Sequence, residues 1–261
     1  MRRTPVLVML LVTAILVGGC GGGGSGSGSG SRPQLVVSAA ASLQTAFTQY
    51  GKVFPDASVR FSFAGSDTLA AQIIAGVRPD VYAAANTTLP DRLYAVNNLV
   101  GEPLRFASNE LVLATRKGNT KIKSLKDIEK PGVKLAIGTS TVPVGNYTIT
   151  TLAKLAPRDR KAIMANVRSQ EPDVTGIVGK LTQGAVDAGF LYITDVHATN
   201  GALQAIHLPD ALQPVVQYGI TIVKGTKHPD QAKAFILGLL SGAGRDALDS
   251  QGFGLPPSGP A

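Results

Sequence analysis

Short apolar segments that are typical of buried β-strands alternate with amphipathic helical patterns along most of this chain, and this alternation constrains the fold more than any other feature. The first strand pattern covers 35–39, and a helical pattern follows over 43–54. Alternating strands and helices of this length predict α/β layers with largely parallel sheets. Further strands are predicted over 59–63, 80–85, 110–115, 133–138, 187–192 and 215–223, and further helices over 69–75, 89–98, 147–155, 174–184, 231–240 and 244–251.

The N-terminal segment has the pattern of a bacterial export signal. Arg2 and Arg3 precede an apolar run over 6–17, which is shorter than the roughly 20 apolar residues that span a bilayer. Small residues precede Cys20, as in the signals that are cleaved from bacterial lipoproteins. We therefore predict a signal peptide over 1–19 and a lipid on Cys20 that anchors the mature chain to the outside of the cell membrane. An ordinary secretory signal in which Cys20 is incidental is the alternative.

A segment of glycine and serine follows the cysteine and separates it from the globular part. Residues 21–31 are almost pure Gly and Ser, a composition that behaves as flexible coil, so 20–33 is predicted to be a linker. Cys20 is the single cysteine in the sequence, which excludes internal disulfides and cysteine metal sites. The formal charge of +8 falls to +6 without Arg2 and Arg3, and the remaining basic residues are scattered, which argues against nucleic-acid binding.

Candidate binding residues lie where predicted strands meet predicted helices. In α/β folds, ligands bind at the carboxyl ends of strands, beside the N-termini of the helices that follow. A helix start has unpaired N–H groups and a partial positive charge, which together suit an anion. Ser42 and Ser66 add hydroxyl donors at two of these junctions. The four junctions cover 39–43, 63–67, 141–147 and 172–175.

Each of these residues also has a plainer interpretation. Ser42 and Ser66 are typical helix N-caps, each of which would stabilise its helix by about 1 kcal/mol. Asp173 is predicted to cap the helix that starts beside it, because its carboxylate would repel an anion if it pointed into a site. Tyr192 ends a predicted strand and is as consistent with a core position as with a binding position. Taken singly, the junctions do not choose between these alternatives.

Several motifs taken together resemble one family. They are Ala39-Ala40-Ala41-Ser42-Leu43, Phe63-Ala64-Gly65-Ser66, Pro79-Asp80-Val81, Val142-Pro143-Val144-Gly145, the segment 189–195 and the segment 218–223. In this order and spacing, over about 35–253, they resemble the molybdate-binding proteins of bacterial ABC importers. The resemblance implies a type II periplasmic-binding-protein fold, in which two α/β domains are joined by a two-strand hinge and the ligand lies in the cleft. The implied boundaries are 34–108 and 225–257 for domain I and 109–224 for domain II.

The resemblance also implies which residues would hold the oxyanion. Ser42 and Ser66 would contribute hydroxyl and backbone N–H groups, and Tyr192 its phenol O–H. Val144 and Val174 would contribute backbone N–H groups. A site of donors alone fits a fully deprotonated oxyanion, whereas hydrogen phosphate would need an acceptor. Molybdenum would be present only as the bound oxyanion, with no protein ligand to the metal and no cofactor, and tungstate is nearly the same size.

Two residues depart from the family pattern. Asp67 follows Ser66 where many relatives have a neutral residue, and Val144 is bulkier than the small residue common at its turn. These departures bear on affinity and ligand preference more than on the fold.

The expected function is that of a monomeric receptor, not an enzyme, that delivers molybdate and tungstate to an ABC permease with its ATPase. A receptor for sulfate or another tetrahedral oxyanion is the first alternative, and an extracellular hydrolase is the second. His197, His207 and His228 are not spaced as metal ligands, and the sequence has no Gly-x-Ser-x-Gly motif. The hydrolase therefore lacks a recognisable pair of nucleophile and base.

Overall fold

The computed structural model describes residues 32–256 and confirms the predicted alternation of strands and helices. Every predicted strand and helix is present, with ends that shift by a few residues. The helix predicted over 147–155, for example, is α4 (Pro143–Ala153), which begins earlier because proline suits the first turn of a helix. The predicted signal peptide over 1–19, the lipidation site Cys20 and the linker up to residue 31 lie outside the described residues.

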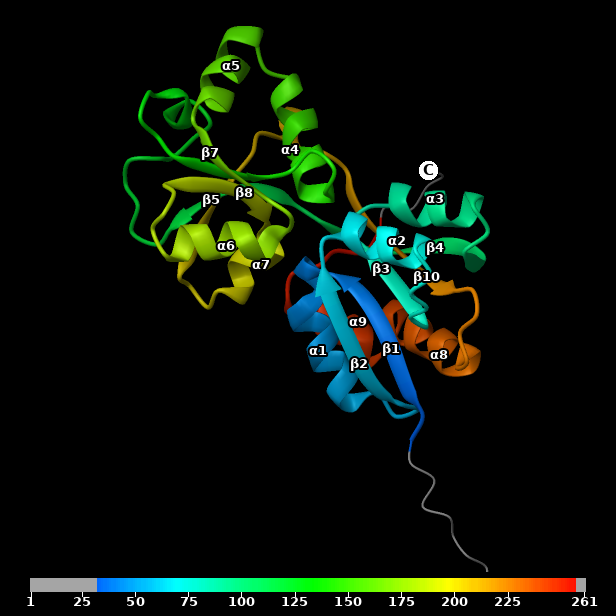
Figure 1. Cartoon of the computed structure of the whole chain (residues 1–261). Helices are drawn as coiled ribbons and strands as arrows, with labels where there is room; N and C mark the ends of the chain where they lie inside the picture. The colour runs from blue at the N-terminus through cyan, green and yellow to red at the C-terminus, as the bar shows by residue number, and fades with distance from the viewer. Residues whose placement is uncertain (1–31, 257–261) are drawn as a thin grey trace, which may run out of the picture. The chain divides into compact units, whose positions relative to one another are not determined.

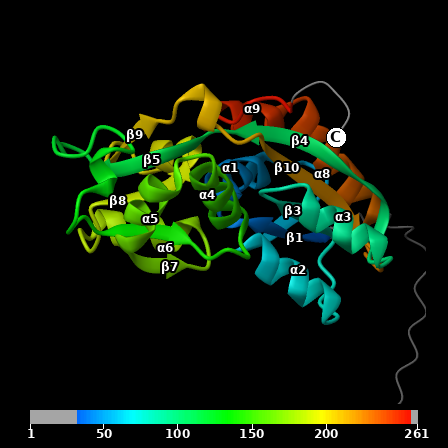
Figure 2. The same ribbon diagram turned by 90° about the horizontal axis from the view of Figure 1, so that it is seen from above.

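One half of the described structure, called the first half below, is built on a five-stranded sheet with the order β2-β1-β3-β10-β4 and takes segments from both ends of the described chain. Helices cover both faces of this sheet: α1, α8 and α9 pack together on one face, and α2 and α3 on the other (Figures 1 and 2). The strands are β1 (Gln34–Ala40), β2 (Ser58–Ala64), β3 (Val81–Ala84), β4 (Leu99–Asn109) and β10 (Val216–Val223). The helices are α1 (Gln44–Val53), α2 (Ser66–Ile74), α3 (Thr88–Ala95), α8 (Pro229–Leu240) and α9 (Ala243–Ser250).

The second half is built on another five-stranded sheet with the order β7-β6-β8-β5-β9. Helices α4 and α6 both pack on β6 and β8, the central strands of this sheet. The strands are β5 (Leu111–Arg116), β6 (Leu135–Gly138), β7 (Val167–Glu171), β8 (Ala188–Tyr192) and β9 (Leu203–His207). The helices besides α4 are α5 (Pro157–Ala165), α6 (Val174–Thr182) and α7 (Ile193–Ala198).

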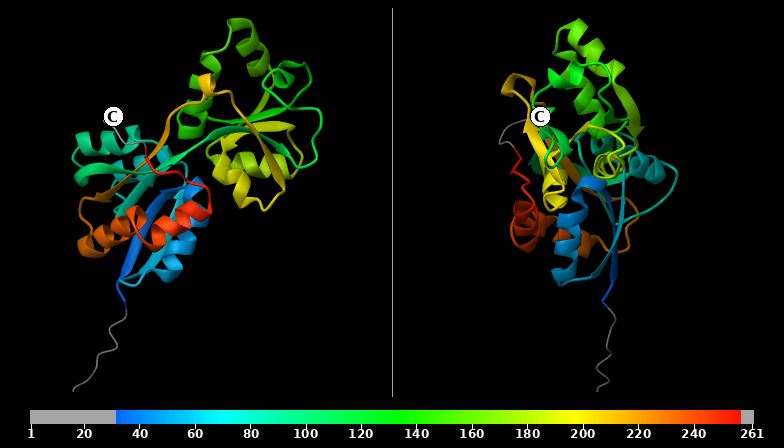
Figure 3. Two further views of the ribbon diagram at one scale, coloured as in Figure 1. Left: turned by 180° about the vertical axis from the view of Figure 1, so that it is seen from behind. Right: turned by 90° about the vertical axis from the view of Figure 1, so that its left-hand side faces the viewer.

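The sheets are largely parallel, as predicted, but mixed, because in each sheet one strand runs against the other four. In the first sheet β1 pairs in parallel with β2 and β3, but β10 runs antiparallel to both of its neighbours. In the second sheet β6 pairs in parallel with β7 and β8, but β5 runs antiparallel to both of its neighbours. The antiparallel strands are those by which the chain passes between the halves, from β4 into β5 and from β9 into β10 (Figure 3).

The sequence patterns missed the strands β4, β7 and β9 and the helices α5 and α7. All three missed strands lie at the edge of a sheet, where one side has no neighbouring strand. The sequence of β7, Val-Arg-Ser-Gln-Glu, accordingly lacks the apolar run of a central strand, and none of its residues is fully buried. Edge strands bury less surface, so their sequences show less apolar patterning.

The division into two domains stays a prediction. The described residues belong to one compact unit, and β10 pairs with the first sheet although the range predicted for domain II contains it. Buried side chains form one large cluster that runs through both sheets and a smaller one beneath α2 and α3. Within residues 32–256, no helix is both long enough and apolar enough to cross a membrane.

Candidate functional site

All five residues of the predicted site line the same pocket. Segments from both halves line this pocket, and each segment follows the carboxyl end of a strand. Ser42 lies in a short 3-10 helix, η1 (Ala41–Leu43), which leads from β1 into α1. The lining residues are Ala40, Ala41, Ser42, Ala64, Gly65, Ser66, Ala85, Val142, Pro143, Val144, Asp173, Val174 and Tyr192.

Three α-helices begin at the wall of the pocket. Ser66 is the first residue of α2, Val174 is the first residue of α6, and Val144 is the second residue of α4. The first N–H groups of a helix have no acceptor within the helix, and the helix dipole places partial positive charge there. Because Pro143 has no N–H, the first donor of α4 belongs to Val144. The side chains of Val144 and Val174 are buried, which leaves their main chain as the polar group.

Ser66 and Ser42 are not helix N-caps, so the plainer interpretation of these residues is wrong. The N-cap positions are Gly65 for α2 and Ala40 for η1, and neither serine makes a capping hydrogen bond. Ser66 Oγ instead accepts from the backbone N–H of Ala85 at 3.1 Å. Ser42 Oγ lies 2.9 Å from the phenol oxygen of Tyr218. Both hydroxyl groups are therefore held by residues from other elements, at the edge of the pocket.

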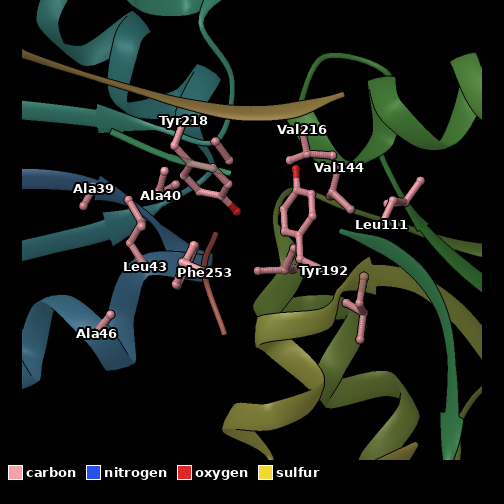
Figure 4. Packing of buried hydrophobic residues seen from close by; sticks show 14 of the residues in the cluster. Ala39, Ala40, Leu43, Ala46, Leu111, Val144, Tyr192, Val216, Tyr218 and Phe253 are labelled. Carbon is pink, nitrogen blue, oxygen red and sulfur yellow. The ribbon is translucent and has the colours of Figure 1, made fainter. Parts of the chain in front are cut away.

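Tyr192 is a buried phenol whose hydroxyl has no partner among the described residues. The residue is 1% exposed, and its Oη makes no hydrogen bond. Its ring packs edge-on against Tyr218, with centroids 6.0 Å apart, and against Tyr147, at 6.4 Å. Burial, and then the neighbouring Tyr218, Tyr147 and Asp195, raises the pKa of Tyr192 well above its usual value. The phenol is therefore neutral and available as a donor. Figure 4 shows its ring beside that of Tyr218.

Two acidic residues lie near the helix starts, and both are engaged by backbone N–H groups. Asp173 Oδ1 accepts from Gly176 N–H at 3.1 Å, which confirms the predicted N-cap of α6. Asp67, which departs from the family pattern, is not part of the pocket lining, and its Oδ1 accepts from Thr68 N–H at 2.8 Å. Both carboxylates thus stabilise a helix start, where negative charge is favourable.

A third carboxylate, Asp195, lies behind the pocket. It is 7% exposed and accepts from the backbone N–H of Tyr192 at 3.0 Å. Burial is the main cause that raises the pKa of Asp195 to about 7, and the charge of Asp173 adds to it, although the bond from Tyr192 lowers it. Asp195 belongs to the sequence motif over 189–195, but its burial depends on the packing of α7.

Two further contacts were not foreseen from the sequence. Tyr218, on β10, lies beside Ser42 although 176 residues separate them, and no local pattern marks such a pair. Gly65 approaches the second half so closely that a Cβ there would lie 2.4 Å from the carbonyl oxygen of Pro172. Only a residue without a side chain allows this approach. The glycine in the family motif therefore has a structural role that we did not predict from the sequence.

The pocket is small, and its hydrogen-bond donors carry no charge. Its cavity volume is about 20 Å³, little more than the roughly 10–15 Å³ that one water needs. Its lining contains no lysine, arginine or histidine, and Asp173 is its one acidic residue. Within residues 32–256, no three His, Cys, Asp or Glu side chains form a group that could hold a metal ion. The arrangement suits a small ion that accepts hydrogen bonds.

Comparison with known proteins gives a consistent result. The sequence profile described as "Bacterial extracellular solute-binding protein" matches residues 35–254. The chain is 36% identical over 258 residues to the molybdate-binding protein ModA of Mycobacterium tuberculosis (strain ATCC 25618 / H37Rv), covering 94% of this chain and 97% of the relative. It is 30% identical over 261 residues to the molybdate-binding protein ModA of Haemophilus influenzae, covering 92% and 96%.

A solved structure confirms the fold. The periplasmic molybdate-binding protein of Azotobacter vinelandii superposes with a TM-score of 0.77 at 20% identity, covering 85% of this chain and all of that one. The type II fold that the sequence motifs implied is therefore present. The extent of the profile match and the identity to the two curated relatives show that the chain belongs to the family of bacterial extracellular solute-binding proteins.

Proposed function

We propose that this protein is an extracytoplasmic receptor that captures molybdate, and tungstate as well, in the pocket between its two halves. Ser42 and Ser66 donate their hydroxyl and backbone N–H groups, Val144 and Val174 donate backbone N–H groups, and Tyr192 donates its phenol proton. Two relatives that align along nearly the whole chain carry the name molybdate-binding protein. The size of the pocket supports a small inorganic ligand and argues against a sugar, a peptide or an amino acid.

The donor set is matched to a dianion without the need for a basic side chain. A dianion that leaves water must recover its hydrogen bonds from the protein, and hydrogen bonds to a charged acceptor are the strong kind. Three α-helix starts supply fixed N–H donors and favourable dipoles. Because these donors are fixed in position, they favour an ion whose size and shape bring its oxygens within reach of all of them.

The observation that carries the proposal is the unpartnered hydroxyl of Tyr192. A buried polar group without a hydrogen bond costs about 1–3 kcal/mol, so such a group is uncommon and calls for a partner. Tyr192 lines the pocket, and its neutral phenol can donate one proton. An oxyanion oxygen bound between the helix starts would accept that proton.

Calorimetric titration with oxyanions tests the proposal. The wild-type protein is expected to release or absorb heat with molybdate and tungstate at micromolar protein. A double variant, Ser42→Ala with Ser66→Ala, is expected to lose most of this binding. The matched control is Ser58→Ala with Ser241→Ala, which removes hydroxyls from two exposed serines. The proposal fails if the wild type binds neither ion, or if both double variants bind alike.

Sulfate is the second candidate, because a donor-only pocket suits any fully ionised tetrahedral anion. Displacement of molybdate by sulfate separates the two candidates, and equal affinity for both ions would contradict a molybdate receptor. A hydrolase is less well supported. The nearest polar partners of Ser42 and Ser66 are the Tyr218 phenol and the Ala85 N–H, neither of which is a general base at neutral pH.

We further propose that the receptor acts as a monomer tethered by a lipid on Cys20 and hands its ligand to an ABC permease with its ATPase. In this scheme the two halves close around the anion, and the closed form docks on the importer. The approach of Gly65 to Pro172 supports closure, since it joins the halves beside the pocket. The linker predicted over 20–33 would leave both halves free to move near the membrane.

A further inference from the structure

A hydroxyl group can either donate or accept, so a pocket of donors depends on where each serine proton is directed. Ser42 Oγ and Tyr218 Oη lie 2.9 Å apart, and either atom could be the donor of this bond. Tyr218 is fully buried, and burial keeps its pKa well above the usual value, so it retains its proton. The direction of the bond follows from the residue on the other side of Tyr218, which is Asn109.

Asn109 has one orientation that satisfies its neighbours. Its Oδ1 accepts from the backbone N–H of Glu110 at 2.9 Å, and an N–H can only donate, so the amide oxygen must lie on that side. The amide nitrogen therefore faces Tyr218 Oη at 3.2 Å and Thr194 Oγ1 at 2.8 Å. An amide NH₂ has two protons and no acceptor, so both bonds run outward from Asn109. Tyr218 Oη accepts one of them.

The phenol of Tyr218 must then donate its own proton elsewhere. Asn109 offers no acceptor on this side, whereas Ser42 Oγ is within hydrogen-bond distance. Tyr218 therefore donates to Ser42, and the hydroxyl proton of Ser42 is left for the pocket. Ser66 shows the same arrangement, because the N–H of Ala85 can only donate to its Oγ. Both serines are thus presented to the pocket as donors.

We propose that Asn109 and Tyr218 are positioning residues that hold the Ser42 hydroxyl as a donor and so make the pocket reject oxyanions that carry a proton. This inference rests on the anion-receptor function proposed above. Molybdate, tungstate and sulfate accept hydrogen bonds at every oxygen. Hydrogen phosphate and hydrogen arsenate have the same charge but include one O–H, which cannot donate to Ser42 where that serine directs its own proton into the pocket. The carboxylate of Asp173 is the one acidic acceptor in the lining, and its Oδ1 already accepts from Gly176 N–H.

The variant Asn109→Asp tests the direction of this chain of hydrogen bonds. One carboxylate oxygen still accepts from Glu110 N–H, while the other replaces the NH₂ group and accepts from Tyr218. The phenol oxygen must then accept from Ser42, which turns the Ser42 proton away from the pocket. The added negative charge weakens the binding of all dianions alike. The informative quantity is therefore the ratio of the dissociation constants of hydrogen phosphate and sulfate, measured by displacement of molybdate at mildly alkaline pH.

We expect Asn109→Asp to lower the ratio of hydrogen phosphate to sulfate dissociation constants at least tenfold, about the effect of one hydrogen bond to a charged group. Tyr218→Phe, which frees the Ser42 hydroxyl to turn, is expected to lower the ratio by about threefold. The control Tyr94→Phe changes a tyrosine that is 45% exposed and should leave the ratio unchanged. If the variants weaken the binding of hydrogen phosphate and of sulfate equally, the inference is wrong and these residues are only structural. If the wild type binds no oxyanion, the proposed function itself is wrong.

Discussion

Tyr192→Phe isolates the contribution of one hydroxyl group to ligand binding. The ring of Tyr192 is packed between Tyr147 and Tyr218, and these contacts do not involve its oxygen. The oxygen itself is buried and has no partner among the described residues. The substitution therefore removes a single polar atom and leaves the packing of the ring in place.

The variant is expected to change affinity and stability in opposite directions. A hydrogen bond to a charged group contributes about 1.5–3 kcal/mol, so molybdate should bind roughly 10- to 150-fold more weakly. An unpartnered buried hydroxyl costs about 1–3 kcal/mol, so its removal should raise the free energy of unfolding of the unliganded protein by about 1 kcal/mol. For a chain of this size, that corresponds to a rise in melting temperature of about 2–4 °C.

Calorimetry gives the affinity, and thermal unfolding with and without molybdate gives the stability. Tyr94→Phe is the matched control, because Tyr94 is 45% exposed and lies on α3 away from the pocket lining. General damage to the fold would lower both affinity and stability, which separates it from the expected result. Affinity within about twofold of the wild type would refute the assignment of Tyr192 as a ligand donor.

Three further predictions follow from the contacts around the pocket. Gly65→Ala should weaken molybdate binding at least about tenfold in calorimetry, because its Cβ would lie 2.4 Å from the Pro172 carbonyl oxygen. The control Gly179→Ala should leave binding unchanged, because its Cβ would meet nothing within 4 Å. Equal effects of the two variants would contradict the closure contact. The pKa of Asp195 is raised from 3.8 to about 7, so the folded state keeps the proton to higher pH than the unfolded state. The free energy of unfolding, measured in urea, should therefore fall as the pH rises between these two pKa values and level off above the higher one. Asp195→Asn should flatten this pH profile. A free energy of unfolding that rises with pH in the wild type would contradict the prediction. Cys20→Ala should release the protein from the membrane fraction into the medium or periplasm, and retention in that fraction would contradict the lipid anchor.

Much of the fold could be predicted because local patterns are sufficient for it. The strand β1 and the helix α6 are apparent from a few neighbouring residues, since apolar spacing determines which face of an element is buried. The N-cap at Asp173 was predictable for the same reason, because it bonds to an N–H only three residues away. The residues proposed for the site, Ser42 and Tyr192 among them, were identified through motifs that span the whole chain.

The tertiary structure decided what depends on residues far apart in the sequence. Strands β4, β7 and β9 form at sheet edges because neighbouring strands offer hydrogen bonds, although their own sequences show little apolar pattern. The bond between Ser42 and Tyr218 joins residues 176 positions apart, and the approach of Gly65 to Pro172 joins the two halves. The sequence by itself thus determined most of the elements and the polar groups at their ends. Which of these groups meet, and which serine proton points into the pocket, follows only from the packing of the whole chain.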